Sequence, residues 1–95
     1  MSEAQSLRDQ IRALDFYRGQ LACQEAIVGR CARDLRAITP DHSLLPALDR
    51  YAAQVWAWCE AADEMIEEAR ADLEEIEAAH TARCRGRYWL NVGEN

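Results

Sequence analysis

The sequence predicts an all-α protein made of two long antiparallel helices, a helical hairpin with coiled-coil-like packing. The chain has 95 residues, enough for one domain, and holds seventeen alanines against four glycines and two prolines. Apolar residues recur at helical spacing along two long segments. One short break separates these segments, and helices joined by a short loop usually fold back on each other. We therefore expect residues 1–95 to form a single helical-hairpin domain.

The first helix is expected over about residues 6–38. A repeat of seven residues is typical of helices that pack along a single stripe. The stripe consists of Leu7, Leu14, Leu21, Val28 and Leu35, with Ile11 and Ala32 between them. Arg18 and Glu25 place charge on the same stripe. Gly19 and Gly29 each weaken the helix by about 1 kcal/mol relative to alanine.

The break between the helices is expected to be a loop at residues 39–43. Thr39 precedes Pro40, and a residue before proline is pushed out of the helical conformation. Ser43 is a suitable cap for the helix that follows.

The second helix is expected over about residues 44–83. Its stripe advances in alternating steps of four and three residues, which is the most regular pattern in the chain: Leu48, Ala52, Val55, Cys59, Ala62, Ile66, Ala69, Leu73, Ile76 and His80. Gly86 offers a helix stop, so residues 84–95 are predicted to form a tail.

Folding the chain about the loop sets the two helices in register. Residues whose numbers sum to roughly 85 then lie side by side. Arg18 is expected near Glu64 and Glu67, where a charge pair on the stripe helps to set this register. Cys23 and Cys59 are expected within about one turn of each other, as small residues of the core.

Large apolar residues flank the two stripes. A two-helix hairpin buries one stripe per helix, so these residues need another surface. We expect that surface to be a second copy of the chain, which gives a helical-bundle homo-oligomer, most simply a dimer. The residues assigned to this interface are Ile27, Tyr51, Trp56, Trp58 and Met65. The alternative is that they cover the seam of their own hairpin.

The net charge is −6, and the second half of the chain carries the whole excess. This balance argues against direct binding of nucleic acid or of an anionic membrane. Nine acids lie within residues 60–77, opposed only by Arg70. They form either a solvated helix face or a recognition face for the basic surface of a larger protein. The acids assigned to partner binding are Glu64, Glu67, Glu68, Glu74 and Glu75.

The tail adds Arg85, Arg87, Tyr88 and Trp89 to the candidate partner-binding site. Arginine and aromatic side chains are frequent in the hot spots of protein interfaces. They also suit stacking and phosphate contacts, so an oligomer that binds or sequesters nucleotides is an alternative function. A third interpretation has the tail folding back onto the open end of the hairpin.

The spacings that hold metals in other helical proteins are incomplete in this chain. Glu64 and Glu67 match the Glu-x-x-Glu spacing of all-α nucleotide pyrophosphohydrolases, but they lie on one helix and mostly outside. Glu77 and His80 match the Glu-x-x-His element of di-iron bundles, for which one copy is insufficient. No glycine-rich phosphate loop or Gly-x-Ser-x-Gly motif occurs. We expect no enzyme activity, no metal and no cofactor.

The start of the chain is polar and lacks the form of a signal peptide, and the four cysteines have no close-pair spacing. We therefore expect a cytoplasmic protein with reduced thiols. In size and composition the chain resembles the small anti-defence proteins of bacteriophages, which act by occupying a surface on a larger host machine. The predicted function is a small non-enzymatic protein-binding protein, an inhibitor or adaptor. A purely structural oligomer is a further alternative.

Overall fold

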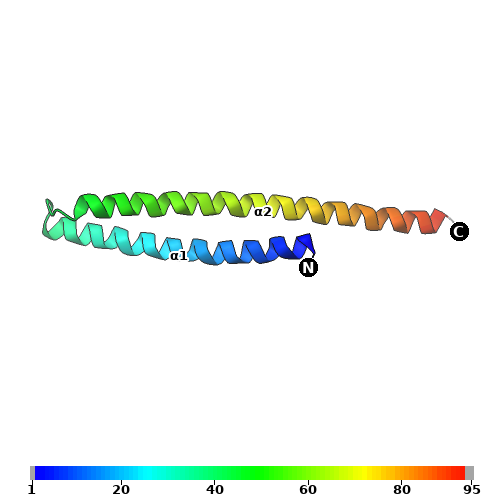
Figure 1. Ribbon diagram of the computed structural model, residues 1–95, viewed down its shortest axis with the longest axis horizontal. Coiled ribbons are helices and arrows are strands. Elements are labelled where there is room, and N and C mark those ends of the chain that lie inside the picture. Colours follow the sequence, from blue (N-terminus) through cyan, green and yellow to red (C-terminus); the bar gives the residue numbers. More distant parts are fainter. Residues whose placement is uncertain (1, 94–95) are drawn as a thin grey trace.

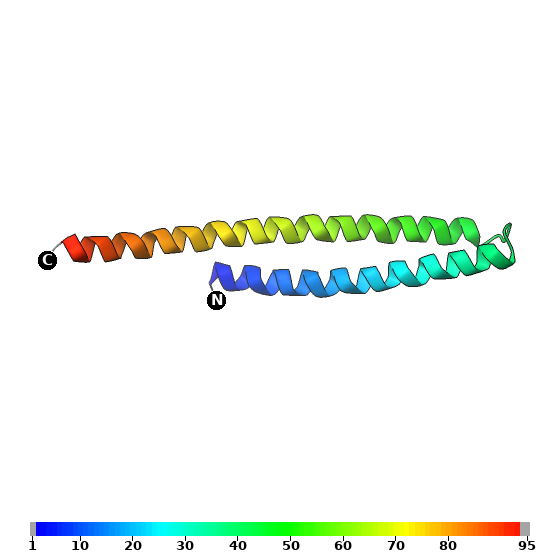
Figure 2. The same cartoon turned by 180° about the vertical axis from the view of Figure 1, so that it is seen from behind.

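The computed structural model describes residues 2–93, with side chains placed for residues 2–86. It is a hairpin of two helices, α1 (Glu3–Ile38) and α2 (Leu45–Gly93), which lie side by side and antiparallel (Figures 1 and 2). The rod measures 82 × 18 × 14 Å, and its radius of gyration is 22.9 Å, against about 12 Å for a compact domain of this length. Most side chains therefore remain at or near the surface.

Helix α1 begins three residues earlier than predicted. The side-chain oxygen of Ser2 accepts a hydrogen bond from the backbone N–H of Gln5 at 3.1 Å, so Ser2 caps the helix. Glu3 lies in the first turn, where a carboxylate interacts favourably with the helix dipole. At the other end Thr39 leaves the helical conformation, with φ −137° and ψ 84°, as expected for a residue before proline.

The turn is organised by His42 rather than by Ser43. The backbone N–H of His42 donates to the carbonyl of Thr39 at 3.0 Å, and the carbonyl of His42 accepts from Leu45 at 3.1 Å. The Nδ1 atom of His42 accepts from the backbone N–H of Leu44 at 3.0 Å. The imidazole thus satisfies the amide of the residue directly before α2.

The predicted stripes form the seam between the helices. The buried apolar residues are Leu21, Ala32, Leu45, Val55, Cys59, Ala62, Ile66 and Ala69, and all of them except Leu45 belong to the predicted stripes. Leu48, Ala52, Leu73 and Ile76 of the α2 stripe are half-buried, and only His80 at its end is exposed. Several of these residues are small, so the two backbones can approach closely.

Three ion pairs lie along one edge of the hairpin, and the two residue numbers in each pair add up to 85. We call this the ion-paired edge: Arg8–Glu77 at 2.9 Å, Arg36–Asp49 at 3.0 Å and Arg70–Asp15 at 3.5 Å. The predicted register is therefore confirmed. Each side chain is about half exposed, so each pair contributes under about 1 kcal/mol.

Two local expectations about this register are wrong. Arg18 bonds to Asp63 at 2.9 Å instead of to Glu64 or Glu67. Asp63 lies fourteen residues from Asp49 and seven from Arg70, on the ion-paired edge, whereas Glu64 and Glu67 are exposed on the outer side of α2. Cys59 is buried as expected. Cys23 is exposed, because it follows the buried Leu21 by two residues and so lies on the other side of α1.

Helix α2 does not stop near residue 83, and residues 84–93 continue it instead of forming a tail. No described glycine has a positive φ, so the chain passes through Gly86 in helical conformation, without the left-handed residue that ends many helices. Because α2 is 13 residues longer than α1, its end extends beyond the start of α1 and does not fold back on it (Figure 1). Neither described helix carries an apolar run that could cross a membrane.

Candidate protein-interaction surfaces

The edge opposite the ion pairs is apolar. Its α2 residues each stand one position before a residue of the core stripe: Leu44, Tyr51, Trp58 and Met65 precede Leu45, Ala52, Cys59 and Ile66. Tyr17, Ile27 and Ile38 of α1 lie on the same side. These seven side chains are between 44% and 81% exposed, and we call them the apolar edge. Large apolar groups at this exposure are not part of the core, and together they make this edge a candidate interaction surface.

Two contacts show that residues from both helices meet on the apolar edge. The Tyr51 hydroxyl donates a hydrogen bond to Oε1 of Gln24 at 3.3 Å. Tyr17 and Trp58 line one open hollow together with Leu14, Ala61, Ala62 and Met65. Ile27 lies one helical turn from Gln24, so it faces the same side.

The apolar edge belongs to a second stripe that runs beside the core stripe on both helices. Its positions advance in alternating steps of three and four residues. On α1 they are Ala13, Tyr17, Gln20, Gln24, Ile27, Cys31, Asp34 and Ile38. On α2 they are Leu44, Ala47, Tyr51, Gln54, Trp58, Ala61 and Met65. Asp34 is the one charged residue among these fifteen, so this half of the second stripe is nearly neutral.

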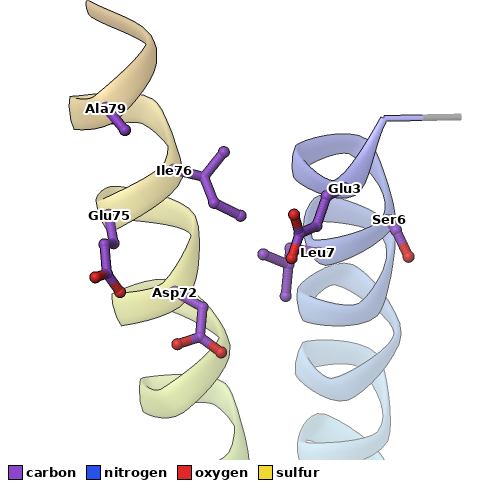
Figure 3. A pocket seen from close by; sticks show the side chains of 7 residues that line it. All are labelled: Glu3, Ser6, Leu7, Asp72, Glu75, Ile76 and Ala79. Carbon is purple, nitrogen blue, oxygen red and sulfur yellow. The ribbon is translucent and has the colours of Figure 1, made fainter. Parts of the chain in front are cut away.

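The second stripe becomes acidic towards the open end of the hairpin. Its next positions on α2 are Glu68, Asp72 and Glu75, and Glu3 continues it on α1. Glu3, Asp72 and Glu75 line one hollow, in which Leu7 of α1 and Ile76 of α2 face each other between the helices (Figure 3). The stripe is therefore divided into a neutral half near the turn and an acidic half near the start of α1.

The acids of α2 form the strongest electrostatic feature. Arg70, the only basic residue within residues 60–77, is held by Asp15 of α1. Asp63 and Glu77 are held by Arg18 and Arg8. The other seven acids of this run are exposed and have no ion pair within the described residues, and we call them the acidic face: Glu60, Glu64, Glu67, Glu68, Asp72, Glu74 and Glu75. The five acids predicted to bind a partner all belong to it.

Trp56 does not lie with the other four residues predicted for the oligomer interface. It stands seven residues from both Asp49 and Asp63, whose carboxylates pair with arginines of α1. Trp56 is therefore on the ion-paired edge, while Ile27, Tyr51, Trp58 and Met65 share the apolar edge. The predicted interface also left out Tyr17, Ile38 and Leu44, although the seven-residue spacing of Leu44, Tyr51, Trp58 and Met65 could have revealed the edge.

The predicted basic and aromatic site lies at the end of α2. Arg85 is exposed on the helix. The side chains of Arg87, Tyr88 and Trp89 lie outside the described residues, although the backbone is helical there.

The groups that could carry metal chemistry do not converge. Nε2 of His80 is 3.6 Å from Sγ of Cys84 on the same helix, and Glu77 is engaged by Arg8. No three His, Cys, Asp or Glu residues within the described part of the chain could hold a metal ion together. The hydrogen bond to Asp63 raises the pKa of the Arg18 guanidinium above its ordinary value.

Comparison of the chain with models of protein families, with curated proteins and with solved structures finds no match.

Proposed function

We propose that this chain is a small non-enzymatic protein-binding protein, an adaptor or inhibitor, that presents the acidic face of α2 to the basic surface of a larger protein. The observation that carries this proposal is the set of seven exposed acids without an ion pair within the described residues. A concentrated single-sign surface speeds association with a complementary partner and disfavours partners of like charge. The proposal does not require a pocket or a cofactor.

We also propose that the chain self-associates into a helical bundle with coiled-coil-like packing, and that it acts in the cytoplasm. The second stripe supports the bundle, because it repeats on both helices the spacing of the core stripe. Cys23, Cys31 and Cys84 are exposed free thiols, which suits a reducing compartment.

The acidic face is tested by charge reversal. The immobilised chain captures proteins from a lysate of the source cells, and the strongest specific ligand is then purified. A variant with Glu67, Glu68, Glu74 and Glu75 replaced by lysine should bind that protein at least about tenfold more weakly at physiological salt. Its helix content and thermal melting, followed by circular dichroism, should stay close to those of the wild type because all four side chains are exposed.

A control variant separates the face from the overall charge. Asp9 and Asp41 are exposed acids elsewhere on the hairpin. Replacing them by lysine changes the net charge as much as replacing Glu67 and Glu68 alone, but should leave affinity within about twofold. Equal losses for the two double variants would show a non-specific charge effect, and unchanged affinity in the fourfold variant would refute the acidic face.

A further inference from the structure

We propose that the neutral half of the second stripe packs against the same surface of a second copy, with the two hairpins antiparallel and centred on Gln54. The inference rests on the proposed self-association and adds which edge is covered and in which direction. The loop of each copy then points away from the centre, and the acidic halves of the two copies extend in opposite directions.

The exposed surface area of the chain is large enough for a second copy to cover part of it. The chain exposes 7468 Å², whereas a compact monomer of 10.8 kDa exposes about 5,500 Å². The excess is about 1,900 Å², and an interface of standard size buries about 800 Å² on each partner. One such interface on the apolar edge leaves the acidic face free for a different protein.

The charge pattern selects the antiparallel direction. A parallel pair, with both loops at one end, places Glu3, Glu68, Asp72 and Glu75 of one copy beside the same acids of the other. Like charges facing each other across an interface are unfavourable. An antiparallel pair avoids this repulsion because each neutral half meets only the other neutral half.

The residues of the apolar edge are self-complementary about Gln54. In the antiparallel pair α2 crosses the second α2, and residues whose numbers add up to about 109 meet. Tyr51 then faces Trp58 of the second copy, and Leu44 faces Met65, so that each of these four large side chains has an apolar partner. Gln54 meets its own equivalent at the axis.

The same axis also provides a partner for Asp34, the one charged residue in the neutral half of the second stripe. Paired residue numbers add up to 85 on the ion-paired edge, but Tyr51 and Gln24 on the apolar edge add up to 75. Taken between the two edges, Gln54 lies level with about residue 26 of α1. About that centre, Asp34 of α1 lies opposite Tyr17 of the second copy. A phenol O–H is a suitable donor to a carboxylate, so the charge has a partner in this direction.

Two tryptophans provide a matched pair of variants for the edge. Trp58 lies on the apolar edge and is 44% exposed, and Trp56 lies on the ion-paired edge and is 54% exposed. Replacing Trp58 by glutamate should weaken self-association at least tenfold in sedimentation equilibrium, while the same change at Trp56 should alter it less than threefold. Circular dichroism of both variants checks that the helices persist. A monomeric wild type at millimolar concentration would overturn both the self-association and this inference.

The direction is measured with a nitroxide spin label at residue 41 of the variant Asp41→Cys, in which the four native cysteines are replaced by alanine. Residue 41 lies about 20 Å along the rod from Gln54, so the antiparallel pair places two labels roughly 40 Å apart. The parallel pair places them within about 20 Å. A short distance in a sample that sedimentation shows to be associated would overturn the antiparallel direction and leave self-association standing.

Discussion

The Nε atom of Arg18 on α1 donates a 2.9 Å hydrogen bond to Oδ1 of Asp63 on α2. Arg18 occupies a position of the core stripe between Leu14 and Leu21, and its side chain is 31% exposed, whereas that of Asp63 is 56% exposed. The guanidinium of Arg18 therefore lies partly within the seam, and its ion pair with Asp63 directs it towards the ion-paired edge. This ion pair supports the register that the three pairs of the ion-paired edge define.

Replacing Arg18 by leucine should stabilise the hairpin by about 1 kcal/mol. Leucine continues the apolar stripe, and the half-exposed Asp63 remains solvated when its partner is lost. Replacing Asp63 by alanine should instead destabilise the hairpin, because Arg18 stays on the seam without its partner. Urea denaturation at one protein concentration measures both changes. A loss of stability in Arg18→Leu would mean that the pair contributes more than leucine burial.

Gly29→Ala and Gly19→Ala should each raise the free energy of unfolding by about 1 kcal/mol. A Cβ atom at either position meets nothing within 4 Å, and both residues are in regular helix outside the second stripe. Gly86→Ala is the internal control. It lies where α2 has no α1 beside it, so it should increase helicity without moving the urea midpoint. Destabilisation by Gly29→Ala would indicate a close contact on that side of α1.

Salt should affect the two proposed interactions in opposite directions. Each chain carries a net charge of −6, so two copies repel one another, and ions screen this repulsion. We expect self-association to strengthen about three- to tenfold between 0.05 and 0.5 M NaCl, measured by sedimentation equilibrium. Binding of a basic partner to the acidic face should weaken over the same range. Self-association that weakens with salt would show that ion pairs hold the copies together.

The helices, their stripes and the register follow from sequence because they depend on local spacing and loop length. Apolar residues at alternating steps of three and four positions, from Leu48 to Ile76, can be covered only along one line of a helix, and a short loop leaves one direction of return. The exposed acids of residues 60–77 were also visible in the sequence, because they fall between the stripe positions.

The sequence by itself determined an all-helical hairpin and the acidic half of α2. It also determined the register, in which residues whose numbers add up to about 85 lie side by side. The tertiary structure decided which side of the seam each flanking residue occupies. Trp56 lies on the ion-paired edge, and Arg18 pairs with Asp63. Tyr17 and Trp58 line the same hollow on the apolar edge. These outcomes depend on the rotation of each helix about its own axis, which is set by packing across the seam. Helix α2 also continues through Gly86, which does not adopt the left-handed conformation that ends many helices.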